Sequence, residues 1–405
     1  TGECRLDAGK AEVRSANSVL AVTTVSHMMQ HIFLGTSVLF PLVVSELGLN
    51  YTEFGIAIAV SSLIGGLFQT LFSMLSRRIA RHVLLGLGNI LLSSGTFLTG
   101  VSHNFFHFLS ARTVANVGTA PQHPMGTSIV SERFDRESVG KAIGIHYGLA
   151  YIGNIIGPVF ATFLVAYVGW RGILFIFSVP ALIVGFTVIL YLKEDRRRDY
   201  SGRVGTTSSL KSDIIALAKT KSVIPIIVTQ ALLSGGTDLG IIVTYTPLFL
   251  ADAMKLDIYQ RGIFYTIGLV GGVLGPVLLG RYAGRTGYLR TAAFSSLIAL
   301  VLVYLLSVYD SANPVLAFHL FFLGLASFAL PTLLQSHLVR ITQEYRRDLV
   351  VGIFFTVGYG FGSLWAGAIG YIIDAYSSFA PAFILMGTLG LAAFVILMDQ
   401  MRKLG

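Results

Sequence analysis

Residues 54–90 read FGIAIAVSSLIGGLFQTLFSMLSRRIARHVLLGLGNI. Two apolar runs, each about as long as a membrane-spanning helix, flank a short loop that carries Arg77, Arg78 and Arg81. A helix needs about 20 mostly apolar residues to cross the hydrocarbon core of a bilayer, whereas a membrane barrel uses segments of about ten alternating residues. This stretch therefore predicts two spanning helices joined by a basic turn.

The same pattern recurs along the whole chain of 405 residues, of which 54% are hydrophobic and 12% are charged. A soluble domain carries roughly 25% charged residues, so most of this chain is expected to lie in lipid. The single cysteine, Cys4, cannot form an internal disulfide. We predict an all-α integral membrane protein with twelve transmembrane helices. Their ranges are 17–45, 53–76, 83–101, 105–131, 140–167, 171–192, 222–250, 261–281, 289–308, 314–340, 349–374 and 378–400.

One long polar stretch, residues 193–221, divides these helices into six and six. It is charged and then rich in Gly, Ser and Thr, which is typical of a flexible linker. The predicted domains are an N-terminal cytoplasmic tail (1–16), a six-helix bundle (17–192), the cytoplasmic linker (193–221) and a second six-helix bundle (222–401).

The two halves also resemble each other. Residues 54–90 align with residues 261–297, so that Gly55 meets Gly262 and Arg78 meets Arg285. Parallel repeats of this kind are typical of a transporter with its substrate site at the repeat interface, near the membrane midplane. We therefore expect two pseudo-symmetric bundles.

The basic residues indicate the orientation. All but four of the 29 Lys and Arg residues fall on one side if both termini share that side. Only Arg171, Lys255 and Arg261 fall on the other side, and Arg112 lies within a span. Because short cytoplasmic loops carry excess Lys and Arg, we predict a multi-pass protein of the cell inner membrane with both termini cytoplasmic. The net charge of +9 then requires no nucleic-acid partner.

Two loops and one helix carry a family resemblance. Residues 76–81 (SRRIAR) and 280–287 (GRYAGRTG) resemble the G-x-x-x-D-R-x-G-R gating loop of the major facilitator superfamily, with Arg78 and Arg285 keeping its basic element. Helix five has Gly144, Gly153 and Gly157-Pro158, and this spacing is similar to the G-x8-G-x3-G-P-x2-G-G motif of proton-coupled antiporters. The resemblance implies the fold of that superfamily, alternating access and export. We expect the glycines and Pro158 to form a close, bent contact between the two halves that seals one side.

A narrower resemblance involves helices one and four. Ser26-His27, residues 117–119 (VGT) and His123-Pro124 resemble the fosmidomycin-resistance group of drug:proton antiporters. That group carries an acidic residue four positions after the helix-one histidine, where this chain has His31.

Few ionisable residues are expected inside the membrane, where each is a functional candidate. Asp238 is the one carboxylate placed deep in a span, and burial would let it take and release a proton near neutral pH. His27 and His31 are spaced i, i+4 and share one helix face, and histidine can relay protons. We assign proton coupling to these three residues.

The candidate substrate-binding residues are polar or aromatic side chains of the helices that line the cavity in the family. They are Arg112, Asn116, Gln122, His123, His146, Tyr147, Tyr151, Gln230, Tyr245, Tyr265, His319, Gln335, Tyr359 and Trp365.

We predict a secondary active transporter, not an enzyme, that exports a small organic solute in exchange for protons, without a cofactor or metal and as a monomer in contact with lipids. The alternative is proton-coupled uptake of an organic anion, with Arg112 binding its carboxylate. A tightly selective polar site favours uptake, and a wide aromatic pocket favours efflux. From other classes, His27 and His31 could ligate haem or a metal in a membrane redox protein, or the chain could be a sensor that moves no substrate.

Overall fold

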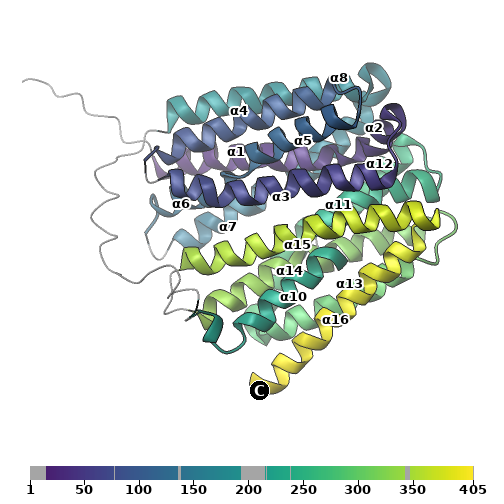
Figure 1. Cartoon of the computed structure of the whole chain (residues 1–405). Coiled ribbons are helices and arrows are strands. Elements are labelled where there is room, and N and C mark those ends of the chain that lie inside the picture. The colour runs from purple at the N-terminus through teal and green to yellow at the C-terminus, as the bar shows by residue number, and fades with distance from the viewer. Residues whose placement is uncertain are drawn as a thin grey trace, which may run out of the picture.

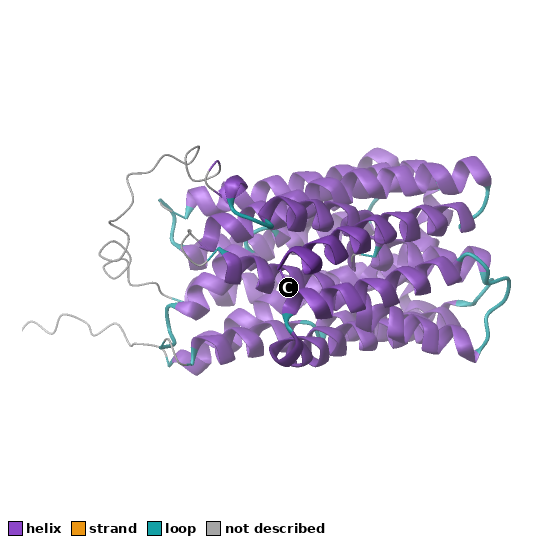
Figure 2. Cartoon of the chain, turned by 90° about the horizontal axis from the view of Figure 1, so that it is seen from below, coloured by secondary structure: helices purple, strands orange, loops and turns teal. Residues whose placement is uncertain are grey.

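The computed structural model describes residues 15–76, 78–135, 138–192, 215, 217–237, 239–342 and 347–404. All regular structure in these residues is helical (Figure 2). The first bundle contains α1 (Ala16–Gly35), η1 (Thr36–Leu39), α2 (Phe40–Leu47), α3 (Tyr51–Leu75), α4 (Arg81–Gly100), α5 (Phe105–Thr119), η2 (Gln122–Gly126), α6 (Thr127–Ser131), α7 (Val139–Ala150) and α8 (Gly153–Tyr191). The second contains α10 (Val223–Gly236), α11 (Leu239–Leu248), η3 (Phe249–Ala253), α12 (Ile258–Thr286), α13 (Tyr288–Leu306), α14 (Pro314–Ile341), α15 (Arg347–Tyr376) and α16 (Ala380–Leu404).

Ten stretches of the described chain are long and apolar enough to cross a membrane. One of them, Lys141–Tyr191, has 51 residues and crosses twice. Its backbone leaves helical geometry at Gly169, where φ is 66°. Gly157 before this point packs on Gly35 of α1, whereas Gly185 after it packs on Gly86 of α4. With the interrupted span from α5 to α6, which is not among the ten, the twelve predicted spans are all present.

Figure 1 shows the first bundle, coloured purple to teal, lying alongside the second, coloured green to yellow. The loops gather at two ends. The Arg81 end holds the start of α4 and the end of α12, and the Asp374 end holds the start of α3 and the end of α15. The basic residues described at the Arg81 end are Arg78, Arg81, Arg133, Lys141, Lys219, Lys221, Arg281, Arg285, Arg290, Arg340, Arg347, Arg402 and Lys403. Those at the Asp374 end are Arg171, Lys255 and Arg261. The structure therefore separates the charges as the sequence predicts.

The hydrophobic core shows how the bundles are joined. At the Asp374 end one continuous core contains residues of both bundles, including Phe40 and Phe54 with Tyr245 and Phe249. Near the Arg81 end, each bundle has a core of its own: one around Leu84 and Leu85, the other around residues 289–300 and 326–338. The described contacts thus hold the halves together most extensively at the Asp374 end.

Of the predicted linker, residues 193–214 and 216 lie outside the described part of the chain, as do residues 1–14 of the predicted tail. Leu217 is buried in the second bundle's core, so the end of the linker range belongs to that bundle.

Candidate functional site

Three spans of the first bundle lose regular α-helical geometry along their length. The first passes into the 3₁₀ turn η1, the fourth contains the π-helical turn η2, and the fifth is interrupted between Ala150 and Gly153. Pro121 and Pro124 contribute to the second interruption because proline donates no backbone hydrogen bond. Single π turns are frequent at functional sites, and irregular backbone at membrane depth is tolerated where it lines a polar cavity. The sequence predicts these spans but not their interruptions.

Four histidine rings meet beside these breaks. The centroid of the His27 ring lies 4.8 Å from that of His31, 5.1 Å from that of His123 and 4.9 Å from that of His146. His27 and His31 come from α1, His123 from η2 and His146 from α7. We call these four residues the histidine cluster. The structure thus joins residues that the sequence assigned separately to proton coupling and to substrate binding.

Two tyrosines extend the histidine cluster. The ring of Tyr147 lies 5.2 Å from that of His27, and the ring of Tyr151 lies 4.8 Å from that of His31. His123 stacks on Phe355 of α15 at 5.9 Å, with 8° between the ring planes. The cluster therefore reaches the second bundle.

Hydrogen bonds orient part of the cluster. His31 Nδ1 lies 3.1 Å from Asn154 Oδ1, and His146 Nδ1 lies 3.2 Å from the hydroxyl of Thr24. These contacts explain why helices one and five pack closely at this level.

A second polar chain supports Gln122. The amide of Asn89 donates to the hydroxyl of Ser26 at 2.7 Å, and that hydroxyl donates to Gln122 Oε1 at 3.1 Å. Sequence reasoning missed Asn89, although a lone amide in the apolar run 83–101 was a signal that could have identified it.

Many buried polar atoms in the first, fourth and fifth spans have no hydrogen-bond partner among the described residues. They are His27 Nδ1 and Nε2, Gln30 Oε1, His31 Nε2, Arg112 Nε, Gln122 Nε2, His123 Nδ1, His146 Nε2 and Asn154 Nδ2. A buried donor or acceptor left unsatisfied is costly, and such groups are usually paired in native proteins. The site is therefore suited to a polar ligand or to water.

Arg112 on α5 is a charged residue buried within the fourth span. Its side chain is 6% exposed, and its guanidinium lies 4.3 Å from the ring centroid of Phe33 and 5.3 Å from that of Phe40. The acidic residues of the described chain lie near the two ends of the bundles, for example Glu46 and Glu132. Arg112 therefore has aromatic neighbours but no carboxylate from the described chain to balance its charge.

The other predicted substrate residues fall into separate groups. Asn116 donates to the hydroxyl of Ser61 at 2.9 Å, which ties α5 to α3. Trp365 donates to the carbonyl of Ala231 at 3.3 Å. Tyr359 packs on Gly66 of the first bundle and Gln230 on Gly358 of its own bundle, and Gln335 is half-buried on α14.

Tyr245 and Tyr265 lie at the closed junction near the Asp374 end. The Tyr245 hydroxyl donates to the carbonyl of Ala366 at 2.5 Å, and the Tyr265 hydroxyl lies 2.6 Å from that of Ser37 in the first bundle. His319 lies apart from the histidine cluster, with Nε2 2.7 Å from the carbonyl of Leu302. Asp238 lies outside the described residues.

The predicted gating residues also lie in separate parts of the structure. Gly153 and Gly157 pack on α1 of their own bundle, where a Cβ on either would meet the backbone oxygen of Met28 or Ile32 at 2.6 Å. Pro158 packs on Gly35 there, and Gly144 has no such neighbour within 4 Å. The expected contact between the halves is thus not made by these glycines, because the face that they share points to α1. A contact between the two bundles is made one turn later in the same helix, where Thr162 meets Gly262 of α12. Arg78 and Arg285 lie at the Arg81 end, away from that contact.

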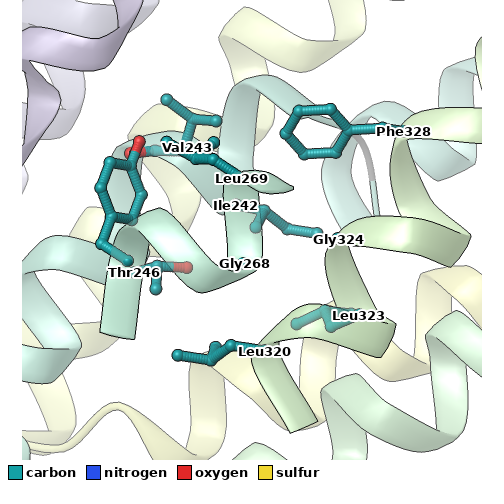
Figure 3. Close-up of a pocket in the computed structure, with 10 residues that line it drawn as sticks. Ile242, Val243, Thr246, Gly268, Leu269, Leu320, Leu323, Gly324 and Phe328 are labelled. Carbon is teal, nitrogen blue, oxygen red and sulfur yellow. The ribbon is translucent and has the colours of Figure 1, made fainter. Parts of the chain in front are cut away.

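Two apolar cavities lie elsewhere. One of about 190 Å³ is bounded by α1, α4 and α8, including Phe33 and Pro180. Another of about 20 Å³ lies among α11, α12 and α14; Figure 3 shows its lining of Leu320, Leu323 and Phe328. Within the described chain, no group of three His, Cys, Asp or Glu residues is arranged to hold a metal ion.

A chain of twelve spanning helices in two bundles, with a buried polar cluster in the first bundle that reaches the second, is a membrane transporter and not an enzyme. It belongs to the Major Facilitator Superfamily, whose family model matches residues 20–366. The structures of this family that it resembles include a mutant of the nucleoside transporter NupG, with a TM-score of 0.80 and 14% identity over 94% of this chain and 99% of that one. A bacterial homologue of the lysosomal transporter Spinster, in an inward-facing and occupied conformation, matches with a TM-score of 0.74 and 15% identity over 95% and 97% of the two chains.

Relatives in sequence include transporters of different kinds. The probable sulfoacetate transporter SauU of Cupriavidus necator is 24% identical over 94% of this chain and 92% of its own length. The quinolone resistance protein NorA of Staphylococcus aureus is 22% identical over 92% of this chain and 94% of its own length. The probable L-galactonate transporter of Escherichia coli is 23% identical, and this match covers 58% of the chain but only about half, 54%, of that relative.

Proposed function

We propose that this chain takes up a small organic anion by alternating access, coupled to protons through the histidine cluster. One observation carries the proposal: Arg112 is buried within the fourth span, where its guanidinium lies over the rings of Phe33 and Phe40 with no described carboxylate beside it. A charge in this position is expensive unless it is paired. An anionic substrate would supply the missing partner.

The character of the site supports uptake over the export that the sequence first suggested. The histidine cluster and its neighbours are compact and polar, with imidazole groups from α1, η2 and α7, the phenol of Tyr147 and the amide of Gln122. The larger described cavity is apolar, and its lining has none of these groups, although it includes Phe33, whose ring Arg112 contacts. The names of several relatives, such as the sulfoacetate and galactarate/D-glucarate transporters, also refer to organic anions.

Proton-coupled export remains the second candidate, because NorA and the chloramphenicol resistance protein CraA are also relatives. The helix-five glycines keep the spacing of the antiporter motif, and two of them, Gly153 and Gly157, pack tightly on α1. In either direction, we place the chain in the inner membrane as a monomer with the Arg81 end in the cytoplasm, following the basic residues.

The test is a flux screen in proteoliposomes with an imposed pH gradient. Sulfoacetate, galactonate and galactarate serve as anion probes, and chloramphenicol and a quinolone serve as export probes. Accumulation of one anion driven by protons supports the proposal, whereas proton-driven movement of the drugs alone would favour export. Asp238→Asn belongs in the same screen, because unchanged proton-driven flux in that variant would remove Asp238 from the coupling mechanism.

A further inference from the structure

The start of α3 is capped by the opposite bundle. Asn50 and Glu53 form a capping box, in which the Asn50 side chain accepts from the Glu53 amide at 2.7 Å. This box leaves the amides of Tyr51 and Thr52, the first two of the helix, without a partner in their own bundle. Such amides need an acceptor from elsewhere.

Asp374 of α15 supplies that acceptor. The Tyr51 amide donates to Asp374 Oδ1 at 3.0 Å, and the Thr52 amide donates to Asp374 Oδ2 at 2.6 Å. The Thr52 hydroxyl adds a third bond to Oδ2 at 2.5 Å. A carboxylate at a helix N-terminus is favoured by the helix dipole, and hydrogen bonds to a charged acceptor are stronger than neutral ones.

The same carboxylate is poorly placed for its own helix. Asp374 lies in the last turn of α15, which ends at Tyr376. A negative charge there opposes the helix dipole. The favourable interaction of Asp374 is therefore with the other bundle, and it exists only while the two bundles meet at this end.

Neighbouring contacts make the capping sensitive to bundle separation. One turn before Asp374, Gly370 lies so close to α3 that a Cβ there would be 2.2 Å from the carbonyl oxygen of Tyr51. The Tyr51 hydroxyl donates to Asp252 Oδ2 of the second bundle at 2.5 Å. All of these contacts join α3 to α15 or η3, so they are lost together if α3 separates from the second bundle.

We propose that Asp374 is a latch that holds the Asp374 end closed by capping α3, and that it must release for the carrier to open there. This inference rests on the alternating access in the proposed function. It adds a conformational residue that neither the gating loops nor the helix-five glycines include.

The experiment measures the opening directly, without transport. Full-length protein with Cys4→Ser, Ser45→Cys and Ser311→Cys is spin-labelled in lipid nanodiscs, and the distance between the two labels is measured by pulsed EPR. Ser45 ends the first span and Ser311 lies in the α13–α14 loop, so the labels report on both bundles at the Asp374 end. Asp374→Asn removes the charge, and we expect the population with long distances to rise by about tenfold.

Two further variants sharpen the result. Thr52→Val keeps the backbone amides of Tyr51 and Thr52 but loses the hydroxyl bond to Asp374. It should therefore give a smaller rise in the population with long distances. If Asp374→Asn does not fold, Thr52→Val alone tests the proposal. Asp399→Asn is the control, because Asp399 pairs with Lys403 of its own helix at the Arg81 end. Unchanged distances in both latch variants, or an equal rise in the control, would overturn the proposal.

These outcomes are separable from those of the flux screen. A distance shift without anion flux in the wild-type protein would reject the proposed substrate class and leave the latch in place. Anion flux with unchanged distances would reject the latch alone.

Discussion

Gly55 and Gly262 occupy equivalent places at two of the contacts between the bundles. A Cβ on Gly55 of α3 would lie 2.7 Å from the carbonyl oxygen of Ala366 on α15, and a Cβ on Gly262 of α12 would lie 2.1 Å from the hydroxyl oxygen of Thr162 on α8. Each glycine thus lets one helix approach the opposite bundle, and the sequence repeat aligns the same two positions. The internal similarity therefore has a structural meaning at this interface.

Gly262→Ala should weaken closure of the Asp374 end. The added methyl group would overlap Thr162, so the two bundles must separate slightly or Thr162 must change rotamer. We expect transport to fall about tenfold and Thr162→Ala to restore much of it in the double variant. Flux in proteoliposomes is the measurement. Gly268→Ala on the same helix is the control, because a methyl group added there would make only ordinary contact with Leu320, at 3.4 Å or more; an equal loss there would refute the packing argument.

Arg112→Met should abolish anion transport without destabilising the protein. Methionine replaces the unbranched stem of the arginine with an apolar one while an uncompensated buried charge disappears, a change that is often neutral or stabilising. We expect flux to fall at least about 100-fold and the melting temperature to stay level or rise by about 1–2 °C.

Arg171→Met is the comparison variant, and we expect it to lower stability and to leave transport intact. Arg171 bonds to Glu46 at 3.0 Å and to the carbonyl of Gly100 at 2.7 Å, so its loss should lower the melting temperature while flux persists. A clear drop in melting temperature for Arg112→Met would instead assign Arg112 a structural role.

His27→Gln should uncouple transport from protons. Both ring nitrogens of His27 lack partners among the described residues, so the amide replaces the imidazole without stranding another group. We expect stimulation of flux by a pH gradient to fall about tenfold, while exchange of labelled for unlabelled substrate continues. His107→Gln on the exposed start of α5 should behave as wild type. Retained stimulation in His27→Gln would exclude His27 from the coupling path.

Asn89→Ala should act on the substrate site indirectly. Asn89 is fully buried and donates to Ser26, which in turn holds Gln122. Loss of a buried hydrogen bond of this kind costs about 1–3 kcal/mol, which should lower the melting temperature, and a displaced Gln122 should raise the KM for the anion more than it lowers kcat. Ser94→Ala, which removes a bond to the Ile90 carbonyl of the same helix, is the control. An unchanged KM in Asn89→Ala would show that the chain of bonds is only structural.

Several features of the site followed from local sequence. The i, i+4 spacing of His27 and His31 places them on one face of a helix, and the centroids of their rings lie 4.8 Å apart. Arg112 stood out because it is a charge within an apolar run. Tyr245 and Tyr265 were identified as polar aromatics in spans, but their hydroxyls join helices at the closed end, which no local pattern indicates.

The sequence by itself determined that the chain crosses the membrane twelve times. The length of each apolar segment and the positions of Lys and Arg are local properties, and they decide directly which segments insert into lipid and in which orientation. It also showed the two related halves. Only the tertiary structure decided that four histidines from three elements form one cluster, that Gly153 and Gly157 face α1, and that Asp374 caps α3. These relationships depend on how helices distant in sequence rotate and pack against one another, and the hydrophobic pattern of a helix surrounded by lipid and protein does not specify that rotation.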